Sequence, residues 1–132
     1  MYVMGKIKES STNYKNRKFL TTCNMTYAAQ LIGGRWKILI VSRLEQVPMR
    51  YGELKKAIPG ITERMLTLQL REMEEDGIVK RTVFPEVPPR VEYELTASAR
   101  ELLPICNYLH EWGTRHRAVL EKKVEETTIP VE

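Results

Sequence analysis

Residues 59–77 read "PGITERMLTLQLREMEEDG" and decide the fold. The apolar residues Leu66, Leu70 and Met73 are spaced i, i+4, i+7, which predicts one amphipathic helix with these three facing inward. Thr62 is expected to begin this helix, because a threonine before an apolar periodic run is a typical N-terminal cap.

The order of charges along this helix is unusual. Arg64 lies in the first turn, whereas four acids close the helix (Glu72, Glu74, Glu75 and Asp76). Acids near a helix C-terminus oppose the helix dipole, so helix stability does not explain the order. We expect the acids to pair with cations of the same chain. A solvated face of mixed charge is the simpler alternative.

The flanking segments place this helix in a larger motif. A shorter helix is expected at about 51–58, where Leu54 and Ile58 are four apart and Pro59 ends the pattern. Two helices joined by so short a turn form a helix-turn-helix, although many helical hairpins share that pattern.

Two strands are expected after the helix-turn-helix, at 78–84 and 90–96. The second alternates strictly, with Val91, Tyr93 and Leu95 on one face. The Pro-rich link 85–89 is too short for a crossover, so the strands must pair as a hairpin. A helix-turn-helix followed by a hairpin is the winged-helix order, and the hairpin is the wing.

Further helices are expected on both sides of this motif. Segments 24–32 and 35–45 read as helices, the first capped by Asn24 or Thr26, with Trp36 as a core anchor at the start of the second.

A long helix, or a pair of helices, should follow Thr96 and extend to about Glu126. Pro104 predicts a kink or a fresh helix start within it. An apolar stripe recurs along it every three or four residues: Leu102, Ile105, Leu109, Trp112, His116 and Leu120. This stripe could cover the core of its own chain, but we favour contact with the same stripe of a second copy.

Length and composition bound the architecture. A chain of 132 residues is one domain by length, and 42% hydrophobic with 29% charged residues is ordinary for a globular protein. The fold class expected is mainly α with a small β-hairpin. We divide the chain into a basic N-terminal arm (1–22), a winged helix-turn-helix domain (23–96) and C-terminal dimerisation helices with a tail (97–132).

The net charge of +4 is concentrated at the N-terminus, where residues 1–20 hold five cations against Glu9. A basic arm often meets nucleic acid, and a solvated tail is equally compatible. No apolar run approaches the roughly 20 residues of a membrane span, and the N-terminus lacks the apolar segment of a secretory signal. We therefore expect a cytoplasmic protein without a membrane partner.

No enzymatic or metal-binding constellation is recognisable. His110 and His116 are six apart without a matching carboxylate set, and Gly33-Gly34 reads as a helix break, not a phosphate loop. We expect no cofactor, no metal and no catalytic residue.

Several short segments, in matching order and spacing over about residues 23–116, carry a resemblance to a known family. Besides Cys23 they are LIGGRWK (31–37), LI (39–40), YGEL (51–54), IPGIT (58–62), RMLT (64–67), QLRE (69–72), DGIV (76–79), Arg81, VPPRVEY (87–93), LT (95–96) and WG (112–113). The chain resembles the HxlR-type winged-helix transcriptional regulators, relatives of the MarR regulators. The resemblance implies homodimers that bind operator DNA as repressors or activators.

Under this reading the helix beginning at Thr62 reads DNA with its N-terminal end, which explains the position of the arginines. Arg64 suits a guanine edge, Thr62 and Thr67 a phosphate or thymine methyl, and Arg71 a backbone phosphate. The remaining DNA-contact candidates lie on the same helix, the preceding helix and the wing: Glu63, Leu68, Tyr51, Lys55, Lys80, Arg81 and Arg90. Arg90 suits a minor groove or flanking phosphates, or alternatively pairs with a glutamate across the ladder. A dimer should recognise an inverted repeat.

Cys23 precedes the first helix and lies near Arg17 and Lys18, and both features lower a thiol pKa. Some members of the family that the chain resembles sense oxidants or electrophiles through the matching cysteine, so Cys23 is a candidate redox sensor for an unknown effector. The alternative is a small packed thiol, which is also our interpretation of Cys106. For the whole protein, the alternative function is a winged helix that binds another protein and not DNA.

Overall fold

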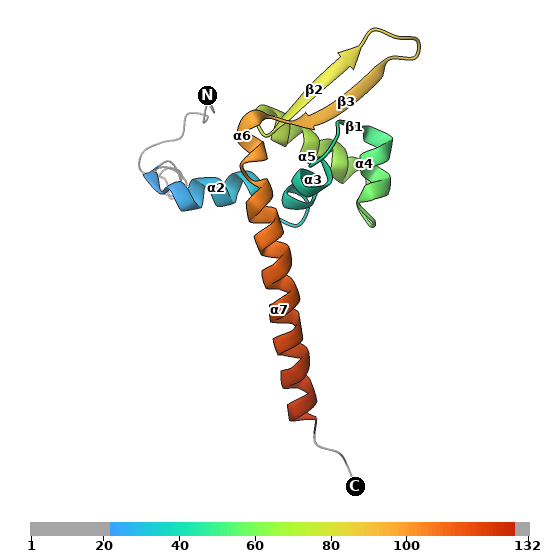
Figure 1. Ribbon diagram of the computed structural model, residues 1–132. Coiled ribbons are helices and arrows are strands. Elements are labelled where there is room, and N and C mark those ends of the chain that lie inside the picture. Colours follow the sequence, from blue (N-terminus) through green and yellow to red (C-terminus); the bar gives the residue numbers. More distant parts are fainter. Residues whose placement is uncertain (1–21, 129–132) are drawn as a thin grey trace, which may run out of the picture.

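The computed structural model describes residues 22–128, so the expected basic arm, apart from its last residue, lies outside the described residues. The elements in chain order are α2 (Asn24–Ile32), α3 (Lys37–Arg43), β1 (Met49–Arg50), α4 (Tyr51–Ala57), α5 (Glu63–Glu75), β2 (Val79–Phe84), β3 (Arg90–Leu95), α6 (Ala97–Arg100) and α7 (Leu103–Thr127). Helices α3, α4 and α5 form a body from which the β2–β3 hairpin projects on one side and α7 on another (Figure 1). The mainly α class with a small β-hairpin is confirmed.

The core lies where the body helices meet the base of the hairpin. Leu66, Leu70 and Met73 of α5 are buried, so the inward stripe expected from the sequence is confirmed. The other buried apolar residues come from nearly every neighbouring element: Ile40, Val41, Leu44, Leu54, Ile58, Ile61, Ile78, Val79, Leu95 and Ala99. Each large side chain contributes about 1.5–3 kcal/mol by leaving water, so α5 is held firmly against the body.

Helix α5 has defined ends. Thr62 is its N-cap, and its hydroxyl accepts a hydrogen bond of 3.1 Å from the Met65 N–H. Gly60 before the helix and Gly77 after it have positive φ of 87° and 73°, which favours glycine at both turns. The axis of the helix is therefore fixed from both ends.

The acidic end of α5 is partly neutralised within the chain. Glu72 Oε2 lies 2.8 Å from Lys37 Nζ of α3, and the lysine side chain is largely buried. The expectation that an acid of this helix pairs with a cation of the same chain is confirmed for Glu72.

The sheet has three strands in the order β1-β3-β2, not the two expected. β1 is a two-residue strand that pairs antiparallel with β3, Met49 opposite Tyr93, and leads directly into α4. Two residues carry no alternation, so the sequence pattern could not reveal β1. The hairpin itself is confirmed, with Phe84 opposite Arg90 at its outer end.

The N-terminal helices differ from expectation at their ends. The N-cap of α2 is Cys23 without a side-chain capping bond, so the prediction of Asn24 or Thr26 as cap was wrong. The helix expected at 35–45 is confined to Lys37–Arg43, and Trp36, its N-cap residue, packs partly against the core.

Beyond the hairpin, Thr96 caps α6 by accepting a hydrogen bond from the Ala99 N–H, and Pro104 lies in the first turn of α7. Of the two outcomes that Pro104 predicted, the fresh helix start is the one observed.

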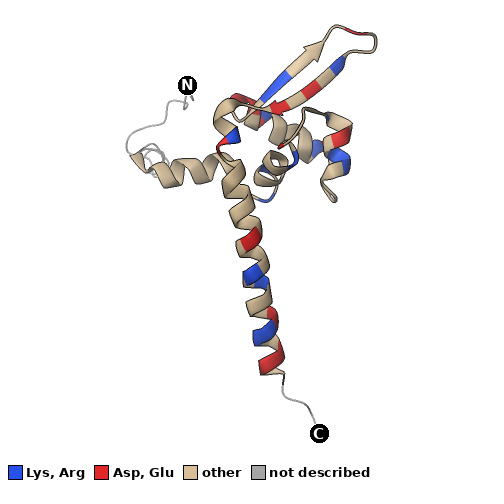
Figure 2. Cartoon of the chain, in the orientation of Figure 1, with Lys and Arg blue, Asp and Glu red and all other residues tan. Residues whose placement is uncertain are grey.

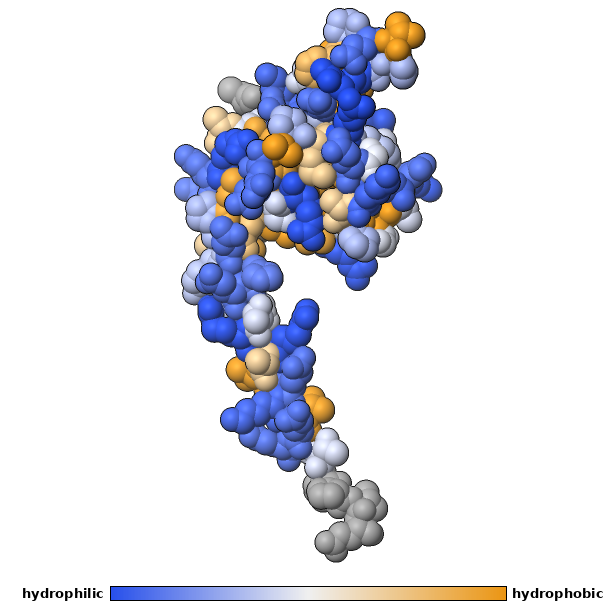
Figure 3. Space-filling model, turned by 45° about the vertical axis from the view of Figure 1, so that its right-hand side comes forward, coloured by the Kyte–Doolittle hydropathy of each residue, from blue (hydrophilic) through white to orange (hydrophobic). Residues whose placement is uncertain are grey.

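Helix α7 leaves most of its apolar side chains in solvent. It has no buried residue, and Leu109 and Trp112 are 46% and 50% exposed. Apolar side chains along the extended helix stand out against a hydrophilic surface (Figure 3). Only the start of the stripe covers the chain's own body, where Leu102 packs against the core.

Candidate nucleic-acid interface

The outward face of α5 is the first part of the candidate interface. Its residues Glu63, Arg64, Thr67, Leu68 and Arg71 are all exposed, as is the cap residue Thr62. Arg64 and Arg71 form no ion pair with any residue in the described range 22–128. The face therefore offers two uncompensated guanidinium groups to an anion.

Tyr51 joins the two helices of the helix-turn-helix. Its hydroxyl donates a hydrogen bond of 2.8 Å to the Glu63 carbonyl and lies 3.1 Å from Thr67 Oγ1. Because the phenolic proton is used on the carbonyl, the threonine hydroxyl is the donor in the second contact. This side chain, expected to contact DNA backbone, is thus engaged in holding α5 against α4. Lys55, on the same helix as Tyr51, is half-buried.

The wing and the neighbouring helix α4 carry side chains of both positive and negative charge. Lysine and arginine occur on α4 and both hairpin strands, with acids interleaved on β3 (Figure 2). Lys80 lies opposite Glu94 in the ladder, with Nζ 3.9 Å from Glu94 Oε1. Arg81, the next residue, is exposed and pairs with no carboxylate in residues 22–128.

Arg90 is held by its own hairpin. Its guanidinium lies 3.5 Å from Glu86 Oε1 and 3.5 Å from Glu92 Oε1. It also covers the ring of Phe84, its partner across the ladder, at 4.1 Å from the centroid. The interpretation as a glutamate-paired residue matches this geometry, although the glutamates lie in the loop and on the same strand, not across the ladder.

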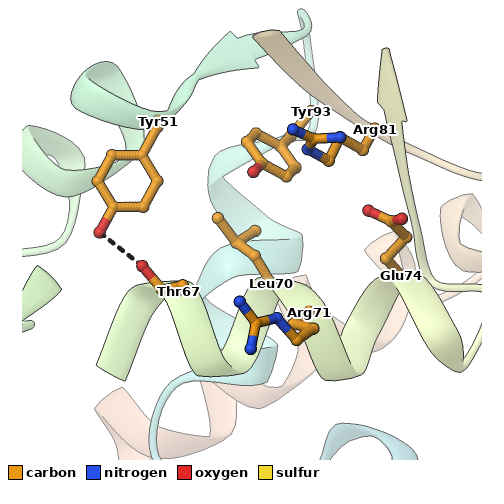
Figure 4. Close-up of a pocket in the computed structure, with 7 residues that line it drawn as sticks. All are labelled: Tyr51, Thr67, Leu70, Arg71, Glu74, Arg81 and Tyr93. Atoms are coloured by element: carbon orange, nitrogen blue, oxygen red, sulfur yellow. Dashed lines mark hydrogen bonds between the residues drawn. The ribbon is translucent and has the colours of Figure 1, made fainter. Parts of the chain in front are cut away.

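The space between α5 and the sheet is a pocket of about 360 Å³. It brings together four of the predicted contact residues, Tyr51, Thr67, Arg71 and Arg81 (Figure 4). The remaining lining residues, Leu70, Glu74 and Tyr93, were not among the predicted contact residues. The hairpin register could have identified Tyr93, because it stands directly opposite Arg81 and so shares its face of the sheet.

Cys23 lies at the N-terminus of α2 and is partly exposed. The Thr26 hydroxyl donates a hydrogen bond of 3.0 Å to Cys23 Sγ. This bond is the largest cause that lowers the pKa of the Cys23 thiol below its ordinary value, and the nearby Thr26 backbone N–H acts in the same direction. Arg17 and Lys18, the cations expected nearby, lie outside the described residues.

Cys106 has the opposite environment. It packs against the core from α7, and burial raises the pKa of its thiol. The prediction that Cys106 is a packing residue is confirmed. The pKa values of the two thiols are therefore shifted in opposite directions, and the thiolate is the nucleophilic form.

Within residues 22–128, no group of three or more His, Cys, Asp or Glu side chains could hold a metal ion. Over the same range, no helix has the length and apolar character needed to cross a membrane.

The helix-turn-helix of α4 and α5, followed by the β2–β3 wing, defines a winged helix-turn-helix protein. Residues 31–121 match the family model described as HxlR-like helix-turn-helix. The chain belongs to this family, and several of its relatives carry the name of HTH-type transcriptional regulators.

One such relative is the uncharacterized HTH-type transcriptional regulator YybR of Bacillus subtilis (strain 168). It is 43% identical over 115 residues, which cover 87% of this chain and 90% of the relative.

Among solved structures, the redox regulator HypR in its reduced form is 45% identical with a TM-score of 0.71. The match covers 76% of this chain and 99% of that one. The oxidized form of HypR is 45% identical with a TM-score of 0.67, covering 70% and 96%. The chain is similar to these proteins in sequence and in fold.

Proposed function

We propose that this protein is a cytoplasmic, homodimeric, sequence-specific DNA-binding transcription regulator that recognises an inverted-repeat operator. The observation that carries the proposal is the exposed arginine-bearing face of α5, which stands beside a wing and whose opposite face is buried in the core. Family membership supports a regulatory role for this face.

The contact residues have different tasks in this proposal. Arg64, in the first turn of α5, reads a guanine edge in the major groove with both ends of its guanidinium. Thr62, Thr67 and Arg71 contact phosphate or a thymine methyl, and Glu63 and Leu68 complete the face that enters the groove. Phosphate contacts set the register of the helix, whereas base contacts set the sequence that is chosen.

In this proposal the wing contacts the DNA on either side of the bases that α5 reads. Arg81 is free for a phosphate, whereas Lys80 and Arg90 must exchange their glutamate partners for DNA before they contribute. We therefore expect Arg81 to contribute more to DNA affinity than either of them.

The exposed apolar face of α7 supports the proposal that two copies of the chain form a dimer. Four residues of the stripe, Ile105, Leu109, Trp112 and Leu120, are each about half exposed. The His116 ring stacks on that of Trp112 at 4.8 Å, and so continues the same face. Water-exposed apolar stripes of this length mark interaction surfaces, and the same stripe on a second chain is a matching partner.

A symmetric dimer places its two α5 helices one DNA turn apart, about 34–36 Å, which selects an inverted repeat. Selection of bound sequences from random DNA tests this. The proposal expects a palindromic consensus whose binding weakens steeply with salt, because bound phosphates release counterions. Absence of any enriched sequence, with salt-insensitive binding to a protein, would favour the interaction-module alternative.

A thiol sensor is a second candidate function, supported by the partly exposed Cys23 with its lowered pKa and by the similarity to the redox regulator HypR. With an alkyl halide, the Cys23 thiolate sulfur attacks the carbon, a C–S bond forms, the carbon–halogen bond breaks and the halide leaves. With a hydroperoxide, the thiolate sulfur attacks the distal oxygen, the O–O bond breaks, and a sulfenic acid and an alkoxide form; the alkoxide then takes a proton from water and leaves as the alcohol.

Mass spectrometry of the treated protein, with a parallel operator-binding assay, tests the sensor. The expected result is modification of Cys23 ahead of Cys106 together with a change in operator affinity. Unchanged operator affinity at complete Cys23 modification would contradict it.

A further inference from the structure

Arg90 begins β3 at the outer end of the wing, and its guanidinium contacts three residues of the same hairpin. The guanidinium lies over the ring of Phe84, its partner across the ladder, at 4.1 Å from the ring centroid. Arg90 Nη2 lies 3.5 Å from Glu86 Oε1, and Arg90 Nε lies 3.5 Å from Glu92 Oε1. We refer to these four residues as the wing clamp.

We propose that Arg90 is a positioning residue, which stays in the wing clamp when DNA is bound and directs the tip of the wing instead of contacting DNA itself. The wing clamp is present without DNA, so its existence does not depend on the proposed function. Its role in DNA binding does rest on that proposed function.

The wing clamp depends on the planar shape of the guanidinium and not only on its charge. Two different nitrogen atoms of the group meet the two carboxylates, while its central carbon lies over the ring. A lysine ammonium is a compact point charge on a flexible stem, so it does not hold all three partners in this way. Arg90→Lys therefore keeps the charge of the wing and loses the clamp.

Release of Arg90 to a phosphate has a high cost. Its side chain is 29% exposed, against 66% for Lys80, and its Nε is buried without a hydrogen bond to any described residue. To reach DNA, the guanidinium would move off the Phe84 ring and leave Glu86 and Glu92 unpaired beside a polyanion. Unpaired carboxylates repel the phosphate backbone, so a retained clamp favours DNA binding more than a released one.

The wing clamp closes the base of the turn that forms the wing tip. Phe84 ends β2, Arg90 begins β3, and residues 85–89 connect them. Val87 in this turn has a fully exposed side chain, and the turn stands clear of the helical body (Figure 1). The direction of the turn is therefore set within the hairpin, where the clamp joins its two ends. A turn that is already ordered loses less conformational freedom when it binds DNA.

NMR of the full-length protein without DNA tests the wing clamp itself. The ring current of Phe84 should shift the Arg90 side-chain signals away from the range of an exposed arginine, and Arg90→Lys assigns these signals by their loss. Arg90→Lys should also lower the backbone order parameter of Val87 without affecting the helices. The matched control is Arg115→Lys on α7, because Arg115 lies over the ring of Tyr108 at 5.9 Å. An order parameter of Val87 that is unchanged in Arg90→Lys would overturn the clamp.

Binding to the selected operator tests the role of the clamp. Arg90→Lys should weaken the complex about fivefold despite its preserved charge, which is the factor for one lost contact between a ring and a cation. Phe84→Leu, which removes the ring and no charge, should weaken the complex by a similar factor. The double variant should bind as each single variant does, because both changes remove the same contact. Arg115→Lys should bind as the wild type does.

A direct contact between Arg90 and DNA gives different results. Operator affinity retained in Arg90→Lys would show that charge alone suffices, as for a phosphate contact. Tighter binding by Phe84→Leu, or loss of the ring-current shift of Arg90 on addition of operator DNA, would show that the guanidinium is released to DNA. Each of these results would overturn the positioning role. If the wild-type protein bound no DNA, the proposed function and the DNA role of the clamp would fail together, whereas the order parameter of Val87 would still decide the clamp.

Discussion

The hydroxyl of Tyr51 in α4 bonds to α5 at two points one turn apart, the Glu63 carbonyl and the Thr67 hydroxyl. This side chain sets the angle between the two helices of the helix-turn-helix. Any contact that α5 makes with a ligand depends on that angle.

Tyr51→Phe should therefore act through the position of α5. Loss of the hydrogen bonds should lower the free energy of unfolding by about 1 kcal/mol, measured by urea denaturation at fixed protein concentration. DNA affinity should fall with it. A fall in DNA affinity with unchanged stability would show instead that the hydroxyl contacts DNA directly.

The exposed apolar face of α7 leads to a separate prediction about the dimer. Leu109→Glu should convert the dimer to a monomer in analytical ultracentrifugation, because it places a charge within the proposed interface. The fold of each chain should persist, since Leu109 is half exposed in the single chain.

A matched control for this change is Ala118→Glu, which adds the same charge to the opposite side of α7 at an exposed position. It should leave the sedimentation coefficient unchanged. A dimer that survives Leu109→Glu would place the interface elsewhere.

The pKa of Cys23 predicts its pH dependence. The thiolate reacts, and the Thr26 hydrogen bonds lower the thiol pKa, so the alkylation rate should rise with pH to a half-maximum below that of an ordinary thiol. Thr26→Val removes the hydroxyl donor and should move the half-maximum to higher pH. Peptide-resolved mass spectrometry measures the alkylation rate of Cys23 against pH in the wild-type protein and in the Thr26→Val variant.

Cys106 is the internal comparison, because burial raises its pKa and its half-maximum should lie above that of Cys23. Equal pH profiles for the two thiols would contradict the assigned environments.

The parts of the fold that the sequence predicted are those with strong local signals. In α5 the apolar spacing, the Thr62 cap and the glycine turn all agree, and the helix begins and ends where they indicate. Strict alternation identified β3 in the same way.

The parts that were missed depend on contacts between distant residues. β1 is too short to carry a period and exists because Met49 pairs with Tyr93. The partners of Arg90 are instead close in sequence, and its contact with Glu86 follows from the geometry of the hairpin turn. Likewise, the hydrogen bonds of Tyr51 require the packing angle of two helices, which no sequence spacing specifies.

The most direct test of the central claim is the effect of Arg64→Ala on binding to the selected operator and to random DNA, measured at several salt concentrations. If Arg64 reads a base from the exposed end of α5, operator binding should weaken by about 1–3 kcal/mol and selectivity should relax at one base position. Random DNA should be affected far less. An equal loss on both DNAs, or no loss on either, would contradict the account.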